Sequence, residues 1–446
     1  MSISWNLAFN CISLKNVKLL FMKRILISIL VFVSFCAFVE AQVQIELPKW
    51  EKGFLDIHHI NTGRGNCTFV VMPDGTTLMI DAGDFNSEAF DENYAPMFAP
   101  KVFPNSSYTA GNAIANYVMN LMGKKNARID YFLLTHFHSD HYGSVTKTSE
   151  PSAKGPYLLT GLTEVGDIIP IKTYVDRDYP DYNFPSILAE ITNGAGGVEK
   201  EAFANLMSFL GFQTKENGMK AERFNVGSKK QFVMRYDSKS FPEFEIRNIK
   251  AGNVLWTGTE GKTRTLFTKE QALGKDGKFN ENMMSTAIVI GYGRFRYFSG
   301  GDNPGLVDQD RPQWSDMESP MAEVVGKVEA MSLDHHSNRD ATNRNILEKL
   351  DPKVVVAQSW STDHPGAEVG ARLTSSNIGT RKRDIFMNLY NNETSVAIGP
   401  WFARNLKCKS GHIVIRVYKN GSYNVFVLDD TKSSLVVKEK FGLYNE

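Results

Sequence analysis

Short apolar runs separated by polar turns recur along most of the chain. Eight of them predict β-strands, because they are rich in β-branched and aromatic residues and are bounded by turn residues. The predicted strands are 54–60, 67–72, 77–80, 131–135, 287–290, 296–298, 330–333 and 354–357. Longer stretches with apolar residues at helical spacing predict helices at 109–122, 197–210, 321–328 and 343–350. This mixture predicts an α/β fold in which helices cover sheets.

Two turn signals add to this pattern. Pro73-Asp74-Gly75 joins two of the predicted strands, as a turn should. Near the end of the chain, residues 412–418 and 423–428 flank Lys419-Asn420-Gly421-Ser422. Its Asn-Gly pair predicts a β-hairpin.

The region after the leader shows no internal repeat and no low-complexity tract. We therefore expect one large domain over residues 45–446. Residues 145–285 are polar and contain many Gly and Pro residues, so we interpret them as partly an insertion. Residues 375–446 are expected to form a C-terminal extension that ends in the hairpin.

The first 41 residues resemble a secretory leader. A basic pair at Lys23-Arg24 precedes the apolar stretch 25–39, and small or β-branched residues lead to Ala41. This order predicts a signal peptide that starts at Met22 and is cleaved after Ala41. An uncleaved anchor is the alternative, but the stretch is shorter than the roughly 20 residues of a membrane span. We therefore expect an exported protein, periplasmic or secreted, whose mature chain has no membrane span.

Composition narrows the function classes. The 446 residues are 42% hydrophobic and 22% charged, which is typical of a folded globular protein. The formal net charge is +1, so no overall polyanion-binding signature exists and a nucleic-acid substrate would need a local groove. Beyond the leader, Cys67 and Cys408 are the remaining cysteines, and a disulfide and two buried thiols are both open.

The segment L-L-T-H-F-H-S-D-H-Y-G (133–143) concentrates candidate chemistry. It holds three of the nine histidines of the chain and follows the predicted strand 131–135. His136 and His138 are two residues apart and can point the same way, while Asp140 and His141 turn toward a second point nearby. One loop could thus serve two metal ions. Imidazole with carboxylate suits zinc, iron or manganese.

Other predicted strands also end in an acid or a histidine. Asp81 ends one strand, Asp302 follows another, the His335-His336 pair follows a third and His364 follows a fourth. This repetition predicts that one edge of the sheets is lined with ligands. Further polar contacts in the site, or turn hydrogen bonds, are expected from Asn282, Ser285 and Asn303.

These motifs together resemble the metallo-β-lactamase superfamily. H-x-H-x-D-H follows a strand, I-D-A-G lies upstream, and G-G-D, H-H and D-H-P lie downstream, over about residues 54–370. More narrowly, the order of motifs is similar to the hydrolase domain of the competence DNA-uptake channel (ComEC type) and to secreted phosphocholine esterases. The resemblance implies a four-layer αβ/βα sandwich with inserted loops and a dinuclear metal site.

The resemblance also implies roles for individual residues. His136 and His138 would hold the first metal, Asp140 and His141 the second, Asp302 would bridge them, Asp81 would orient ligands by hydrogen bonds, and His335 or His336 would complete the set. One departure stands out, because the superfamily commonly has a further ligand histidine between the cluster and the bridging aspartate. Residues 142–334 contain no histidine. His335, His336, His364 or an extra water remain open as its replacement.

The predicted activity follows from this site. Two divalent ions, zinc first with manganese or iron as alternatives, would activate water and polarise the electrophile. We predict a metal-dependent hydrolase of a small-molecule or polymeric phosphoester, a phosphodiesterase or nuclease-like enzyme, with His364 or Asp140 assisting the leaving group. Hydrolysis of a carboxylic bond, as in lactonases and β-lactamases, is one alternative. A non-catalytic metal-binding relative is the other, and the oligomeric state stays open.

Four further features receive structural interpretations. His58 and His59 lie in the strand 54–60, so one should face the core and one should face out. Gly63-Arg64-Gly65-Asn66 is a tight loop in which Arg64 either contacts a phosphate or only serves a turn. Trp360 beside His364 could line a pocket. The run Thr380-Arg381-Lys382-Arg383 is interpreted as solvent-exposed.

Overall fold

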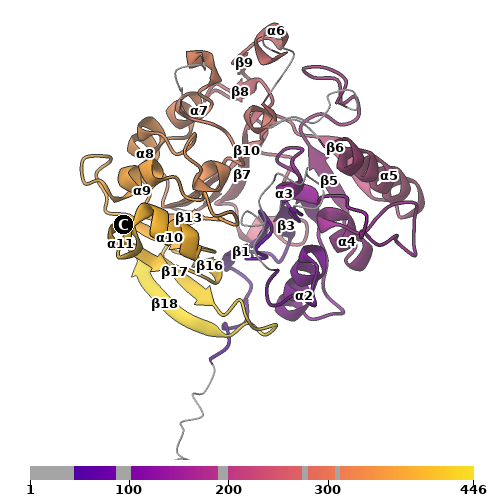
Figure 1. Cartoon of the computed structure of the whole chain (residues 1–446), viewed down its shortest axis with the longest axis horizontal. Helices are drawn as coiled ribbons and strands as arrows, with labels where there is room; N and C mark the ends of the chain where they lie inside the picture. Colours follow the sequence, from indigo (N-terminus) through magenta and orange to yellow (C-terminus); the bar gives the residue numbers. More distant parts are fainter. Residues whose placement is uncertain (1–44, 87–101, 189–198, 274–279, 307–311, 446) are drawn as a thin grey trace, which may run out of the picture. The chain divides into compact units, whose positions relative to one another are not determined.

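The computed structural model describes residues 45–86, 102–188, 199–273, 280–306 and 312–445 (Figure 1). Contacts divide the chain into residues 1–45 and residues 46–446, and the second unit carries the fold. The predicted signal peptide lies outside the described residues. Within the described ranges, no helix is both long and apolar enough to cross a membrane.

One nine-stranded sheet is built from both ends of the domain. Its strand order is β18-β17-β16-β1-β2-β3-β4-β5-β6. Neighbours from β18 to β3 are antiparallel, and β3 to β6 are parallel. The strands are β1 (Leu55–His59), β2 (Thr68–Val71), β3 (Thr77–Ile80), β4 (Tyr131–Leu133), β5 (Thr173–Asp176), β6 (Lys220–Arg223), β16 (His412–Val417), β17 (Tyr423–Leu428) and β18 (Val437–Tyr444).

A second nine-stranded sheet has the order β15-β14-β13-β12-β11-β10-β7-β8-β9. Here β11 to β15 are parallel, while β11, β10, β7, β8 and β9 are antiparallel neighbours. The strands are β7 (Phe244–Ala251), β8 (Val254–Trp256), β9 (Thr263–Thr265), β10 (Ala287–Tyr292), β11 (Phe295–Ser299), β12 (Ala330–Ser332), β13 (Val354–Ala357), β14 (Asp384–Met387) and β15 (Leu406–Cys408).

The two sheets pack face to face. Ile57 and Leu78 of the first sheet share one apolar core with Ile290 and Val356 of the second. The opposite face of each sheet is covered by helices, as Figure 1 shows for α2, α4 and α5 on one side and α7 to α9 on the other. This arrangement is the predicted four-layer αβ/βα sandwich. Strands buried on both faces explain why the apolar runs of the sequence are continuous rather than alternating.

The helices lie mainly between strands. Among the described residues they are α2 (Ala110–Met122), α3 (Ser139–Tyr142), α4 (Gly161–Ile168), α5 (Lys200–Glu216), α6 (Lys269–Leu273), α7 (Glu318–Val325), α8 (Arg344–Leu350), α9 (Ala367–Thr374), α10 (Asn392–Ile398) and α11 (Pro400–Ala403). Short 3₁₀ turns include η4 (Ser238–Ser240), η5 (Glu281–Met284), η6 (Gln313–Ser315) and η7 (Asp334–Ser337). Helix α2 begins where the Thr109 side chain accepts a hydrogen bond from the backbone N–H of Asn112, and it ends at Gly123.

Each of the eight predicted strands and four predicted helices overlaps an element of the structure. The hairpin of β16 and β17 also forms, and β18 follows it and pairs with β17. The described part of residues 145–285 supplies β5 to β9, so this segment contributes edge strands to both sheets. Residues 375–446 likewise supply β14 to β18.

The prediction for the histidines of β1 was wrong in one respect. Both His58 and His59 are buried. His58 faces α2, where its Nδ1 lies 2.9 Å from the Tyr117 hydroxyl. His59 faces the other sheet, where its Nε2 lies 2.8 Å from the Tyr297 hydroxyl of β11. Neither ring faces solvent, because a helix covers the outer side of this central strand.

Candidate metal centre

The predicted ligands come together at one edge of the sheets. In the first sheet, Asp81 follows β3 and residues 136–141 follow β4, and these strands are parallel neighbours. In the second sheet, Asp302 lies shortly after β11 and His335-His336 after β12, again parallel neighbours. Ligand sites in α/β proteins form outside the carboxyl ends of parallel strands. The predicted ligands lie at the carboxyl ends of parallel strands in both sheets.

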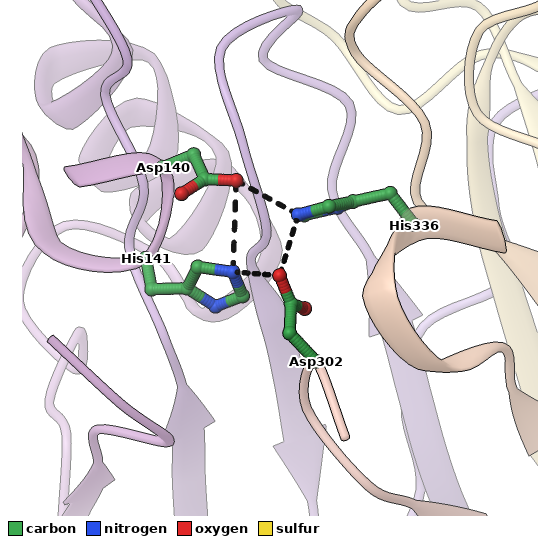
Figure 2. A group of neighbouring side chains, drawn as sticks. All are labelled: Asp140, His141, Asp302 and His336. Atoms are coloured by element: carbon green, nitrogen blue, oxygen red, sulfur yellow. Dashed lines mark ion pairs between the residues drawn. The ribbon is translucent and has the colours of Figure 1, made fainter. Parts of the chain in front are cut away.

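Two carboxylates and two imidazoles point toward one another at this edge (Figure 2). They belong to Asp140, His141, Asp302 and His336, and one ligand atom of each lies within 4.8 Å of the others. His336 Nε2 is 2.8 Å from Asp140 Oδ2 and 3.2 Å from Asp302 Oδ2. His141 Nε2 is 3.2 Å from Asp302 Oδ2 and 3.7 Å from Asp140 Oδ2. All four side chains are buried.

The Nδ1 atoms of His141 and His336, which point away from the centre of the group, are each held by a hydrogen bond. His141 Nδ1 lies 2.8 Å from Asp81 Oδ2, and Asp81 also accepts hydrogen bonds from the backbone N–H and hydroxyl of Thr135. His336 Nδ1 lies 3.0 Å from the backbone carbonyl oxygen of Gln358. Both partners accept a hydrogen bond from Nδ1, which in the neutral ring leaves the Nε2 lone pair directed at the centre of the group. Such anchors fix ring orientation in protein metal sites.

The charge of the group favours a cation. Burial disfavours the imidazolium form of His141, but Asp302, Asp140 and Asp81 outweigh this effect and raise its pKa well above the usual value. Burial likewise lowers the pKa of His336, and Asp302 and Asp140 raise it to about 10. The two carboxylates therefore demand positive charge in a buried place. A bound divalent ion would supply the same positive charge as protonation of both His141 and His336.

Two buried atoms also lack the partners that such atoms normally have. His141 Nε2 and Asp302 Oδ1 make no hydrogen bond to any described residue. Buried polar atoms are rarely left in this state, and an ion is one of the usual reasons. The donor set of two imidazoles and two carboxylates suits zinc, manganese or iron. The residues thus fit a metal ion.

A second set of histidines faces the same aspartate. His136 Nε2 is 3.0 Å from His138 Nδ1 and 3.8 Å from Asp302 Oδ2. From the other sheet, His335 Nε2 lies 3.9 Å from Asp302 Oδ2. Asp302 Oδ2 is therefore near four imidazoles, two from each set, which is the position expected for a bridging carboxylate.

An unusual turn aims the adjacent histidines of η7 at the same aspartate. His335 and His336 have φ of 47° and 52°, and Ser337 has φ of 65°. Left-handed backbone is costly for side chains of this kind and is found mainly where the surroundings hold it. Here Asp340 Oδ1 lies 2.5 Å from His335 Nδ1. The turn lets two neighbouring residues of one strand end reach Asp302 together.

The loop Gly63-Arg64-Gly65-Asn66 supports the ligand loop. The backbone N–H of Asn66 donates to the carbonyl oxygen of Asp140, at 2.8 Å. A Cβ on Gly65 would lie 2.1 Å from that oxygen, and a Cβ on Gly83 would lie 1.8 Å from it. Both glycines are therefore required by the close approach of Asp140. Arg64 donates to the carbonyl oxygen of Phe85, so this loop has a structural role in the described contacts.

His364 and Trp360 lie beside the group. The His364 ring stacks on His336 with centroids 4.9 Å apart. Burial and the neighbouring His336 lower the pKa of His364 to about 3, so this imidazole is neutral near pH 7. The Trp360 indole N–H donates to Asp140 Oδ2 at 3.1 Å. Trp360 thus contacts a candidate ligand directly, which its position in the sequence only suggested.

The other expected polar residues also lie at the centre. Asn282 Nδ2 is 3.2 Å from His335 Nε2, and the Ser285 hydroxyl oxygen accepts from the backbone N–H of Asp302. Asn303 donates to the carbonyl oxygen of Gly300 and so holds the turn before Asp302.

Sequence reasoning missed several supporting residues. Glu281 accepts a hydrogen bond from the backbone N–H of Phe137, and it pairs with Arg177 at 2.9 Å. Gln358 and Asp340 anchor the two histidines of η7. A signal existed for Arg177, since the apolar run 173–175 precedes Asp176 and Arg177 just as other runs precede ligands. The contact of Glu281 with Phe137 joins residues 144 apart in the chain, whereas Asp340 is only five residues from His335.

Cys67 and Cys408 are both buried free thiols. Cys67 lies in the core between the first sheet and its helices, and Cys408 lies in the core between the sheets. The sequence left a disulfide and two buried thiols open, and the structure has two buried thiols.

Comparisons with known proteins bear on the family. Residues 60–157 match the model of the metallo-beta-lactamase superfamily. This part of the chain is similar to the metallo-β-lactamase superfamily. The matched segment contains the ligand loop after β4, and the two facing sheets with outer helices agree with this fold. The predicted resemblance to the superfamily is confirmed, whereas its narrower similarity to the competence-channel hydrolase stays a prediction.

Solved structures give weaker likenesses. One is a mutant of the CmlA beta-hydroxylase, at 13% identity and a TM-score of 0.35, which covers 83% of this chain and 55% of that one. Another is zinc-bound PqqB from Methylobacterium extorquens, at 12% identity and a TM-score of 0.33, which covers 81% of this chain and 99% of that one. The chain thus spans about half the length of the CmlA structure. Among curated proteins none matches it.

Proposed function

We propose that this protein is an exported metal-dependent hydrolase that cleaves a phosphoester. The observation that carries the proposal is the convergence of Asp140, His141, Asp302 and His336, with the far nitrogen of each imidazole already anchored. Here the inward nitrogens meet carboxylates that themselves require a cation.

Two divalent ions are proposed, with zinc first and manganese or iron as alternatives. One would be held by Asp140, His141, Asp302 and His336. The other would be held by His136 and His138, with Asp302 shared and His335 in the place of the absent third histidine. His335 is preferred over His364 because its Nε2 lies 3.9 Å from Asp302 Oδ2, whereas the His364 ring stacks on His336.

Bound divalent ions would supply Lewis acidity and lower the pKa of water. The chain's own residues do the rest. Asp81 keeps the His141 ring oriented, and Trp360 holds Asp140 through its indole N–H. Burial raises the pKa of Asp140, but His141 and His336 outweigh this and lower it well below the usual range, so Asp140 stays ionised and is a poor proton donor. Neutral His364 is the better group to contact the leaving group, by donating a hydrogen bond.

The phosphoester preference rests on the order of motifs in the sequence. The alternative, a lactone or another carboxylic bond, uses the same centre, and a non-catalytic relative would keep the metal alone. The near-zero net charge does not favour long nucleic acids as the substrate. A small-molecule phosphodiester is therefore the first substrate to try.

The test measures metal content and hydrolysis in the same preparation. Purified protein is analysed for zinc, manganese and iron, and is assayed with a bis(nitrophenyl) phosphate, a nitrophenyl phosphate, a lactone and a β-lactam. We expect about two metal ions per chain and cleavage of the phosphodiester that stops on chelation and returns with added metal. Protein without metal contradicts the metal centre. Metal-loaded protein that cleaves the lactone or β-lactam but neither phosphate ester contradicts the phosphoester proposal.

Export has a separate test. Protein recovered from the periplasm or medium of an expressing bacterium should begin at Gln42, which follows the proposed cleavage site. A chain that stays in the cytoplasm with an intact leader would contradict export without affecting the metal centre.

A further inference from the structure

The run Thr380-Arg381-Lys382-Arg383 forms one wall of a pocket of about 510 Å³. The opposite walls are the turn after α9 and the segment from Arg404 to Lys407 around the start of β15. The sequence interpretation of this run as solvent-exposed holds for Lys382, but Arg383 is only 6% exposed. A buried arginine in a pocket wall calls for a different explanation.

The pocket lies away from the metal centre. Asp384 begins β14, which runs parallel to β13 with Val354 opposite Asp384 and Ala357 opposite Met387. The carboxyl end of β13 leads to Gln358, which contacts His336. The pocket is therefore at the amino end of these strands, with the length of a four-residue strand, about 13 Å, in between. A ligand bound there would not touch the metal-binding residues.

Five cationic side chains and one carboxylate line the pocket. The carboxylate is already engaged, since Asp384 accepts a hydrogen bond from the Tyr444 hydroxyl and lies 3.7 Å from Lys407 Nζ. The cationic residues are Arg381, Lys382, Arg383, Arg404 and Lys407. Because the net charge of the whole chain is only +1, this concentration of positive charge is local.

Several of these cations have unused capacity. The side chains of Lys382 and Arg404 are exposed and make no hydrogen bond or ion pair with any described residue. Arg383 donates to the backbone carbonyls of Ile378, Leu373 and Leu347, and only its Nε has no described partner. Arg381 is the better-satisfied member, with Asp351 and Glu329 nearby.

The loop that carries the run is held rigid from behind. The Asp351 carboxylate accepts hydrogen bonds from the backbone N–H groups of Thr380 and Arg381, at 2.8 and 3.1 Å. Gly379 has φ of 73°, and a Cβ there would lie 2.5 Å from Asp351 Oδ1. The positive charges are thus presented by a preorganised turn, and ligands bind more tightly to such a site because less ordering is needed.

From this geometry we propose a second ligand site, an anion pocket at residues 374–384 and 404–407 that binds a phosphate-bearing small molecule. Arginine and lysine in combination are the usual partners of phosphoryl oxygens. Ser375 and Ser376 in the pocket wall add hydroxyl donors. A volume of about 510 Å³ matches a ligand of nucleotide size. The pocket is independent of the proposed hydrolase activity.

The test uses calorimetric titration of the full chain at low salt. The probes are inorganic phosphate and methylenediphosphonate, a pyrophosphate analogue whose P–C–P bridge resists hydrolysis. A duplex DNA and anionic vesicles are titrated for comparison. The double variant Lys382→Ala/Arg404→Ala removes two exposed charges from the pocket. Lys124→Ala/Lys125→Ala is the matched control, since both lysines are exposed and lie in the loop after α2. Asp302→Asn reports any binding at the metal centre.

We expect methylenediphosphonate to bind the wild type, and the pocket variant to bind it at least about tenfold more weakly. The control variant and Asp302→Asn should retain that binding, and the pocket variant should retain wild-type hydrolysis of the phosphodiester. Three results would overturn the proposal. They are loss of binding in Asp302→Asn alone, an equal loss in the pocket variant and in the control variant, and no binding of either phosphorus probe to the wild type. So would binding of duplex DNA or anionic vesicles without binding of the diphosphonate.

Discussion

Six of the nine histidines lie at the candidate metal centre, and the other three lie on β1 and β16. His58, His59 and His412 of the second group are as buried as the first. Each makes a hydrogen bond to a neutral partner: the Tyr117 hydroxyl for His58, the Tyr297 hydroxyl for His59 and the backbone N–H of Asn61 for His412. His58 Nε2 also lies 3.7 Å from Asp56 Oδ2. At the metal centre, by contrast, the inward nitrogens of His141 and His336 meet carboxylates.

Charge separates His141 and His336 from the histidines of β1 and β16 more clearly than burial does. Burial lowers the pKa of His59 and His412 to about 3, and it lowers that of His58 even though Asp56 is near. Asp56 is already neutralised by Arg416, whose guanidinium lies 2.6 Å from it. At the metal centre two carboxylates converge on His141 and His336, and the pKa of both histidines rises. Burial lowers the pKa of His136, His138 and His364, as it does in the β1 and β16 group. A buried histidine is thus a ligand candidate when its carboxylate partner lacks a cation of its own.

The largest effect is expected for Asp302→Asn. It removes the charge that faces four imidazoles while keeping the size of the side chain. Bound metal should fall and hydrolysis should drop by about a thousandfold or more. Elemental analysis and initial rates check both. Wild-type metal content in this variant would contradict the claim that the Asp302 carboxylate makes the histidines around it metal ligands.

On β1, Asp56→Asn is expected to lower the stability of the fold and to leave the metal content unchanged. The buried Arg416 would lose its counter-charge, which typically costs about 3–5 kcal/mol of unfolding free energy. Denaturant unfolding measures the loss, and metal content per folded chain should stay at the wild-type value. Loss of metal from protein that is still folded would show that the β1 network serves the centre as well.

A smaller effect is expected for Asp81→Asn. The amide keeps a hydrogen-bond acceptor for His141 Nδ1 but loses the negative charge. Metal affinity should weaken by about 10- to 100-fold, with the fold intact. Competition with a chelator of known affinity gives the value, and circular dichroism controls for folding. An unchanged affinity would mean that orientation alone, without charge, is what Asp81 contributes.

The smallest effect is a dependence of stability on pH. His412 stays neutral in the folded protein because burial lowers its pKa to about 3, whereas the unfolded chain protonates it below about 6.5. The unfolded state then binds more protons, so stability falls as pH falls through this window, by up to about 1.4 kcal/mol per pH unit. His412→Asn should remove that contribution and flatten the profile. Urea unfolding of metal-free wild type and variant between about pH 7 and 4.5 compares the slopes, and parallel profiles would refute the assignment.

Local patterns explain what could be predicted. Asp140, His141, Asp302 and His336 each follow an apolar strand within a few residues, and strand ends of one sheet share an edge. The contributions of Gln358, Asp340 and Glu281 could not be predicted in this way. Glu281 precedes β10 of one sheet and meets Phe137 after β4 of the other, so its contact forms only when the sheets pack. Gln358 meets His336 because β12 and β13 are neighbours, and Asp340 meets His335 because of the left-handed turn between them.

The sequence by itself determined the α/β class, most of the strands and the set of candidate ligands, because periodicity and strand-end chemistry are local properties. Only the tertiary structure decided which histidine nitrogens face carboxylates, why Gly65 and Gly83 must lack a side chain, and that a basic run encloses a pocket. These outcomes depend on distances between segments that lie tens to hundreds of residues apart. Such distances are set by the packing of the two sheets, which no single stretch of the chain encodes.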